Sequence, residues 1–191
     1  MDAVVVQQFE RKHQKQVENL FRNGLEAYSD IRDIQSSFVA TQLSPSGDMH
    51  DIYVSYVVKS DEGYNFWVAL SGDEVVGCVG CVPHSRDNSL ELQRLSVAES
   101  HRRFGLGKKL LGTVEKWGKE RPFSRIMLST LREMNLARSF YQKNGFAEFA
   151  QEERDVSLNF TLSPHSRVIH VVYYQKLLGD ITTTSDSAWS I

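Results

Sequence analysis

The feature that most constrains this chain is a strand that runs through a short basic turn into a helix. Alternation of apolar and polar residues predicts a strand over 89–97, and helical spacing of apolar residues predicts a helix over 105–119. Between them stands Arg102-Arg-Phe-Gly-Leu-Gly107. The start of a helix leaves backbone N–H groups unpaired, and the helix dipole favours negative charge there. The segment therefore predicts a bound phosphate or pyrophosphate, with Arg102, Arg103 and Lys108 as countercharges.

Two glycines before a helix are also typical of a plain tight turn with solvated arginines. The spacing excludes two other nucleotide-binding motifs. A dinucleotide fingerprint needs G-x-x-G after the first glycine pair, and a Walker loop needs G-K-[ST]. Neither pattern continues from Gly105 and Gly107.

The rest of the chain predicts one α+β domain, residues 1–178, with a mixed, mostly antiparallel sheet of about seven strands flanked by helices. Strands are expected at 3–9, 66–70, 75–82, 89–97, 124–129, 146–152 and 168–177, and helices at 13–28, 34–43, 105–119 and 135–143. Residues 51–59 fit either a helix or a strand, and 157–166 fit a polar loop. Residues 179–191 are rich in Ser, Thr and Asp and predict a flexible polar tail.

Composition excludes several classes of protein. The formal net charge of −2 argues against nucleic-acid binding driven by overall charge. No window approaches 18 apolar residues and no signal peptide stands at the N-terminus, so we expect no membrane span. The two cysteines, Cys78 and Cys81, lie three apart in a predicted buried strand and should face opposite sides. We therefore expect buried thiols in a reducing, cytoplasmic setting, and no metal site.

A second motif gives the first one a context. Asn135-Leu-Ala-Arg-Ser-Phe-Tyr-Gln-Lys-Asn-Gly-Phe146 reads N-x-A…Y-x-x-x-G-F, one position from an N-x-x-A…Y-x-x-x-G-F pattern. Arg102–Gly107 fits Q/R-x-x-G-x-G/A after a strand ending Leu95-Ser-Val97. Together they resemble the GNAT superfamily of N-acetyltransferases. Phe66-Trp-Val-Ala, Val76-Gly-Cys-Val-Gly and Val168–Tyr173 are further similar to its N-acetyltransferase 8-like group, and the resemblance spans about 65–177.

Two positions depart from the pattern of that group. Many relatives have proline in the pyrophosphate turn where this chain has Glu99. Members of the group often carry an apolar membrane segment near the N-terminus, and residues 29–60 here are too polar for one.

The resemblance implies acetyl-CoA as the acetyl donor and a primary amine as the acceptor. It also implies that the strand ending at Val97 separates from its neighbour, so that the Leu95 and Val97 backbones hold pantetheine and the Val97 N–H faces the developing oxyanion. The residues expected to bind acetyl-CoA are Leu95, Ser96, Val97, Arg102, Arg103, Phe104, Gly105, Leu106, Gly107, Lys108, Asn135 and Tyr141.

Glu91 and Tyr141 are the candidate catalytic residues. Glu91 lies eleven positions before Arg102, where the histone-modifying branch of the superfamily has its catalytic glutamate. On a regular strand Glu91 would share a face with Gln93, Leu95 and Val97 and could take a proton from the amine, directly or through water. Its alternative is a glutamate at a strand edge that faces solvent or pairs with Arg94.

Tyr141 stands where relatives place a tyrosine next to the coenzyme sulfur. A phenol with a pKa of ~10 can return a proton to a thiolate of ~8.5. The alternative is a tyrosine that packs in the core. Asn135 either contacts pantetheine or caps the helix that follows it. His170, in the last expected strand, is an alternative base, although a lone strand histidine is more often structural.

The sequence leaves the acceptor and the oligomeric state open. The acceptor is either a small amine of amino-acid type or a protein amine, at a lysine side chain or an N-terminus. A third reading is an acyl-CoA-binding module without catalysis, against which the retention of Glu91 and Tyr141 weighs. Segments 29–60 and 152–167 are expected to read the acceptor as loops. Arg94 and Arg154 are candidate partners for an acceptor carboxylate, with solvation as the alternative.

Overall fold

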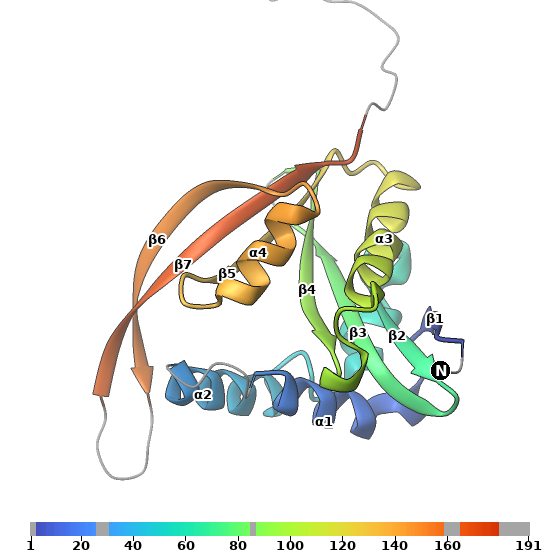
Figure 1. Ribbon diagram of the computed structural model, residues 1–191, viewed down its shortest axis with the longest axis horizontal. Helices are drawn as coiled ribbons and strands as arrows, with labels where there is room; N and C mark the ends of the chain where they lie inside the picture. The colour runs from blue at the N-terminus through green and yellow to red at the C-terminus, as the bar shows by residue number, and fades with distance from the viewer. Residues whose placement is uncertain (1–2, 26–30, 85–86, 159–164, 180–191) are drawn as a thin grey trace, which may run out of the picture.

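Seven strands form one sheet in the order β1-β2-β3-β4-β5-β7-β6 (Figure 1). The computed structural model describes residues 3–25, 31–84, 87–158 and 165–179. Neighbouring strands run antiparallel except for the parallel pair β4 and β5. The expected α+β fold is confirmed. The strands are β1 (Val5–Gln8), β2 (Asn65–Ser71), β3 (Glu74–Pro83), β4 (Ser89–Val97), β5 (Arg125–Leu131), β6 (Ala147–Leu158) and β7 (His165–Leu177).

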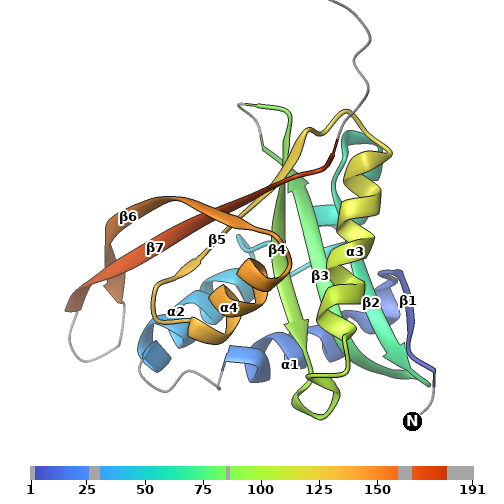
Figure 2. The same cartoon turned by 45° about the horizontal axis from the view of Figure 1, so that its top comes forward.

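Helices cover both faces of the sheet. On one face lie α1 (Gln14–Leu25), α2 (Arg32–Leu43) and the π-helical turn η3 (Tyr53–Val57). On the other lie α3 (Leu106–Lys119) and α4 (Asn135–Lys143) (Figures 1 and 2). Three short 3₁₀ turns complete the described helices: η1 (Arg11–His13), η4 (Ser60–Glu62) and η5 (Glu99–His101).

Each face of the sheet has its own apolar core. The α3 side buries residues that include Leu110, Leu128 and Tyr174, and the α1 side buries residues that include Phe21 and Phe66. The central strand β3 is apolar on both faces because both are covered. Cys81 belongs to the α3-side core and Cys78 to the α1-side core, as their spacing predicts. Burial raises the pKa of Cys78 to about 12 and that of Cys81 further, which disfavours thiolate chemistry at both.

One sequence prediction needs correction here, and one open choice is resolved. The segment 152–167 is not a loop, because β6 continues to Leu158 and β7 begins at His165, and the two strands pair without a break from Glu152↔Val171 to Leu158↔His165. Residues 152–155 are exposed, and a strand without a buried face lacks the apolar alternation that predicts strands. Segment 51–59 is helical, with η3 at its centre. The predicted tail from Gly179 onward lies almost wholly outside the described residues.

A bulge in β4 reverses the order in which its side chains alternate between the two faces of the sheet. Gly80 pairs with Gln93 and Cys78 with Ser96, so three steps along β4 oppose two steps along β3. Arg94, at the bulge, adopts a left-handed backbone with a φ of 57°. Before the bulge, Leu92 faces the α3 side; after it, Leu95 and Val97 pack on that side. The expectation that Glu91 shares a face with Leu95 and Val97 is therefore wrong.

β4 and β5 are paired only at their beginnings. Their ladder covers Ser89↔Arg125, Leu90↔Ile126 and Glu91↔Met127, and then the strands diverge (Figure 2). Ladder bonds to β5 therefore end before the bulge. The separation expected for the strand that ends at Val97 is present.

Candidate active site

The turn between β4 and α3 has the geometry of an anion site. Arg103 and Gly105 both have left-handed backbones, with φ of 69° and 81°, and Gly105 occupies the N-cap position of α3. Arg102 folds back, and its Nε donates to the Val97 carbonyl at 3.1 Å. The side chain of Arg102 thus ties the turn to the end of β4, in addition to its expected role as a countercharge.

Six consecutive N–H groups in this turn have no acceptor in the part of the chain that the structure describes. The first helical bond of α3 is Lys109 N–H to the Gly105 carbonyl, at 3.0 Å. No described residue accepts a well-formed hydrogen bond from the backbone N–H groups of residues 103–108. Together with the exposed side chains of Arg103 and Lys108, these donors fit a pyrophosphate.

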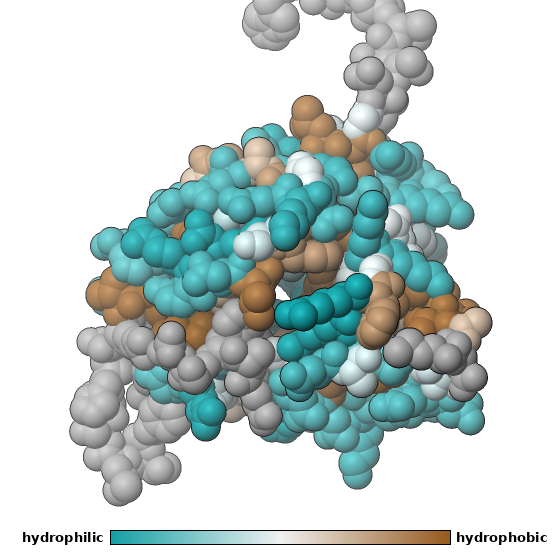
Figure 3. Space-filling model, in the orientation of Figure 1, coloured by the Kyte–Doolittle hydropathy of each residue, from teal (hydrophilic) through white to brown (hydrophobic). Residues whose placement is uncertain are grey.

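A gap opens at the surface between α4 and the segment that enters α3 (Figure 3). Beside it, a Cβ atom added at Gly107 would lie 3.2 Å from the Phe140 ring and 3.9 Å from Val97 Cγ2. The absence of a side chain at Gly107 therefore lets the Phe140 ring pack directly against α3. Phe140 was missed in the sequence reading, although its place three residues after Ala137 on the inward helix face was a usable signal.

The backbone of β4 faces the opening to β5. Ala98 N–H donates to the Val76 carbonyl at 2.9 Å, so in an antiparallel ladder Val97 and Leu95 direct their N–H groups away from β3. Those groups point to the side from which β5 has diverged. The geometry fits the expectation that the Leu95 and Val97 backbones meet a ligand.

The other residues expected to bind acetyl-CoA occupy three kinds of position. The Ser96 side chain lies on the α1 side, 3.5 Å from where a Gly24 Cβ would be, so only its backbone borders the opening. Leu106 is buried in the core, whereas Phe104 is 67% exposed beside the turn. Asn135 is exposed as the first residue of α4, and Met134 holds the N-cap position without a side-chain bond. The structure therefore does not bear out the capping alternative for Asn135.

Tyr141 is buried on the inner face of α4. Its ring packs edge-on to Phe146, with centroids 5.7 Å apart, and near Tyr174 at 6.4 Å. It adjoins Phe140, which borders the gap at Gly107. The position serves the core and also lies one residue from the gap, so both sequence interpretations of Tyr141 stay open.

Glu91 lies on the opposite face of the sheet from the anion turn. It pairs with Val82 and Met127 and, like Gln93, faces the side of α1 and η3. Tyr173 stands on β7, across the opening from Glu91. Burial and the hydrogen bond to Glu152 raise the pKa of Tyr173, and the negative charge of Glu91 adds to this increase. Glu91 therefore lies within electrostatic reach of Tyr173.

Arg154 belongs to the same surface as Tyr173. It stands on β6, not in a loop, and its Nη2 donates to Glu152 Oε2 at 2.9 Å and to the Tyr173 hydroxyl. Its side chain is 51% exposed. The arginine is thus held by neighbours on β6 and β7 while its guanidinium remains accessible.

Arg94 is not available to an acceptor. Its guanidinium makes two bonds of 2.9 Å to Asp48 and one of 3.0 Å to Gln42, and it lies over the Phe38 ring. Neither solvation nor binding of an acceptor carboxylate describes Arg94, and its acidic partner is Asp48 rather than Glu91. A hollow of about 370 Å³ lies next to this pair, lined by residues that include Asp48, Tyr56, Lys59 and Gln93.

His170 has a partner of its own. Its Nδ1 lies 3.4 Å from Glu153 Oε1, on the residue opposite in the β6–β7 ladder, although the pair lacks hydrogen-bond geometry. This favours the structural reading of His170. Among the described residues no group of three or more His, Cys, Asp or Glu side chains is arranged to hold a metal ion. No described helix combines the length and apolar character needed to cross a bilayer.

The fold and the site define a class of protein. An open sheet with a parallel pair that diverges, a bulged strand beside the opening, and an anion turn at a helix start together describe a scaffold that can hold a phosphate-bearing ligand at the end of β4. The chain belongs to the acetyltransferase (GNAT) family, whose sequence profile matches residues 28–146.

Within that family the chain is similar to N-acetyltransferase 8 proteins, as the sequence predicted. It is 35% identical over 130 residues to N-acetyltransferase 8 of Rattus norvegicus, covering 66% of this chain and 56% of that protein. It is 32% identical over 129 residues to the N-acetylaspartate synthetase of Rattus norvegicus, covering 68% and 42%. The chain spans about half the length of the curated relatives it matches.

Solved structures agree on the fold. A GNAT-family acetyltransferase of Staphylococcus aureus has a TM-score of 0.66 at 22% identity, covering 93% of this chain and all of that one. An acetyltransferase of Salmonella typhimurium, described with its cofactor acetyl-CoA, has a TM-score of 0.67 at 14% identity, covering 98% of this chain and all of that one.

Proposed function

We propose that this protein is an acetyl-CoA-dependent N-acetyltransferase that acts on a small primary amine of amino-acid type. The observation that carries the proposal is the bulge in β4. One strand presents Glu91 to one face of the sheet and the side chains of Leu95 and Val97 to the other, beside an opening to β5. A donor bound on the α3 side and an acceptor bound on the α1 side would meet at that opening.

The donor side is supported by the turn and the gap. The N–H groups of residues 103–108 and nearby basic side chains suit the pyrophosphate of acetyl-CoA. The surface gap between α4 and the segment that enters α3 would admit the pantetheine arm toward the end of β4. The Val97 N–H, directed away from β3, would donate to the thioester oxygen as it gains negative charge.

The acceptor side is supported by the residues around the opening. The amine nitrogen attacks the thioester carbon, forming the C–N bond, and the C–S bond breaks. Glu91 takes the proton that the amine loses, directly or through a water, and Tyr141 gives a proton to the departing thiolate. These roles are supported by the positions of the two residues, because Glu91 faces the α1 side of the sheet and Tyr141 lies on the α3 side.

A small acceptor with a carboxylate is favoured by Arg154. Its accessible guanidinium lies beside Tyr173, which is within electrostatic reach of Glu91. On the same side of the sheet α2 packs against β6, so the helix borders this surface. The similar rat N-acetylaspartate synthetase is named for a product of this kind.

A competition assay tests the proposal. Purified protein is given acetyl-CoA with free amino acids, amino-acid conjugates and lysine peptides together, and each product is quantified. We expect acetylated small amines, with Arg154→Ala raising KM for carboxylate-bearing acceptors more than for simple amines. Higher kcat/KM on peptides would favour a protein acetyltransferase. Binding of acetyl-CoA without any turnover would favour a binding module.

We also propose that the protein acts in the cytoplasm. Two free, buried thiols support a reducing setting, where such thiols persist. Cell fractionation of the tagged full-length protein tests this. Recovery with membranes or in a secreted fraction would contradict it.

A further inference from the structure

A basic pocket opens between α3 and α4, next to the anion turn but outside it. Its volume is about 260 Å³, and the residues that matter for its charge are Lys108, Glu115, Lys143 and Lys176. Gly112 forms part of the α3 wall, and a Cβ added there would meet nothing within 4 Å. The wall is therefore open enough for a ligand to lie against the helix.

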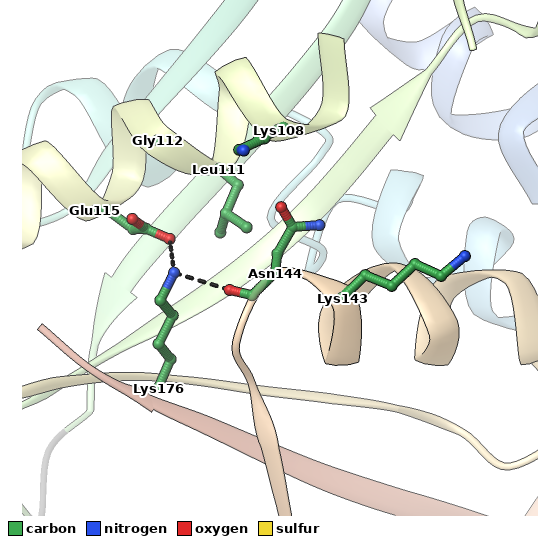
Figure 4. A pocket seen from close by; sticks show the side chains of 7 residues that line it. All are labelled: Lys108, Leu111, Gly112, Glu115, Lys143, Asn144 and Lys176. Carbon is green, nitrogen blue, oxygen red and sulfur yellow. Dashed lines mark hydrogen bonds and ion pairs between the residues drawn. The ribbon is translucent and has the colours of Figure 1, made fainter. Parts of the chain in front are cut away.

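One of the three lysines is already neutralised. Lys176 Nζ donates to Glu115 Oε1 at 2.7 Å and to the Asn144 carbonyl at 2.8 Å (Figure 4). Lys108 and Lys143 have no ion pair with any described residue, and both are exposed. Three positive charges against one negative charge give the pocket a surplus of two.

The two unpaired lysines stand on different walls. Lys108 belongs to α3, whereas Lys143 is the last residue of α4 and extends away from the Glu115–Lys176 pair in Figure 4. A lysine stem has four rotatable bonds, so its ammonium group can swing over the opening when an anion is present. The arrangement fits an anion with a charge of about −2, such as a phosphate monoester.

The position of the pocket relative to the turn sets the size of the ligand. Lys108 lines the pocket and also ends the run of unpaired N–H groups. Gly112 lies four residues further along α3, or about 6 Å at 1.5 Å per residue. A ligand whose pyrophosphate lies on the turn would need a further phosphate group, separate from the pyrophosphate, about one helical turn away. Coenzyme A has that chemistry, because its ribose bears a 3′-phosphate close to the pyrophosphate.

We propose that the pocket between α3 and α4 binds the 3′-phosphate of coenzyme A through Lys143 and Lys108. The inference rests on the proposed use of acetyl-CoA. It gives Lys143 a role in discriminating the donor, separate from the chemistry at Glu91 and Tyr141.

Calorimetric titration with coenzyme A and with dephospho-coenzyme A, which lacks only the 3′-phosphate, tests the proposal without turnover. Wild-type protein should bind coenzyme A about tenfold more tightly, a difference of the size expected from two exposed cations. Lys143→Ala should weaken the binding of coenzyme A by about fivefold and leave the affinity for dephospho-coenzyme A unchanged. Lys119→Ala, which removes an exposed lysine at the far end of α3, should change neither affinity.

A second pair of variants separates charge from shape. Gly112→Asp and Gly112→Asn add side chains of equal size to open space, so both should fold. The aspartate variant should bind coenzyme A about tenfold more weakly than the asparagine variant, because its negative charge repels the phosphate. This ratio of affinities should shrink at high salt. Dephospho-coenzyme A should not distinguish the two variants.

The outcomes separate this proposal from the proposed function. Equal affinity of the wild type for both ligands, or equal losses for both in Lys143→Ala, would overturn the phosphate site and leave acetyl transfer standing. If neither ligand binds, the proposed function fails and this inference fails with it.

Discussion

Arg94 Nε and Nη2 each lie 2.9 Å from a carboxylate oxygen of Asp48, in a two-bond contact across 46 positions of sequence. Arg94 is the bulge residue of β4, and Asp48 lies in the segment that follows α2. The side chains are only 15% and 23% exposed, and Tyr56 donates its hydroxyl hydrogen to the same carboxylate. The contact therefore ties the bulge, which sets the faces to which the β4 side chains point, to the helical layer on the α1 side.

Asp48→Asn should destabilise the protein by about 3 kcal/mol, because it leaves the mostly buried Arg94 charge without its partner. Urea unfolding followed by tryptophan fluorescence measures this. Asp51→Asn is the matched control, since the Asp51–Arg11 pair is 40% and 61% exposed and should be worth about 1 kcal/mol or less. Equal losses in the two variants would show that the Arg94–Asp48 pair has no special role.

His13 makes the stability of the protein depend on pH. Burial lowers the pKa of His13 below 6.5, and its Nδ1 accepts the Glu10 backbone N–H at 3.1 Å. The unfolded chain therefore binds the proton more readily, so stability is full above pH 6.5 and falls as the pH drops from there toward the folded pKa. His13→Gln, which keeps an acceptor, should flatten the free energy of unfolding between pH 7 and 5. A slope identical to that of the wild type would contradict this assignment.

Gly107→Val should abolish acetyl-CoA binding while the fold persists. The added Cβ would lie 3.2 Å from the Phe140 ring, and its methyl groups would fill the gap between α3 and α4. Titration calorimetry measures the affinity, and circular dichroism checks the fold. Gly107→Ala is the graded comparison and should retain weakened binding. A folded valine variant with wild-type affinity would place the cofactor elsewhere.

Tyr141→Phe should lower kcat by ~10²–10⁴-fold while the affinity for acetyl-CoA changes little, because the hydroxyl acts only as the thiolate leaves. Tyr174→Phe is the control. Tyr174 is also buried, and its hydroxyl bonds to Arg138 and Glu148, so its loss should reduce stability without a comparable fall in kcat. An unchanged kcat in Tyr141→Phe, with chemistry rate-limiting, would make Tyr141 a packing residue.

Glu91→Gln should reduce turnover at neutral pH and recover part of it at high pH. A primary amine with a pKa of ~8–10 is mostly protonated at pH 7, and the base is needed only while that proton remains. The measurement is kcat/KM against pH for both proteins. Glu74→Gln, exposed at the start of β3, is expected to follow the wild type. A constant ratio between Glu91→Gln and wild type across the range would remove Glu91 as the base.

Much of this architecture is encoded locally. The alternation over Ser89–Val97, the apolar spacing of α3 and the start and end of α4 depend on residues a few positions apart, and the structure has these elements where the sequence predicts them. The anion turn is local too, because Gly105 can adopt a left-handed backbone at the start of α3 without strain. These features, and the two motifs, are sufficient to indicate the family.

What the tertiary structure decided is which residues meet. Glu91 and Leu95 lie an even number of positions apart, which predicts a shared face, but one extra residue at Arg94 reverses it. That bulge is held by Asp48, and the opening at Gly107 is bordered by Phe140, 33 positions away. Lys176 similarly finds Glu115 across 61 positions. Periodicity carries no information about such long-range contacts, because they depend on sheet order and on how the helical layers pack.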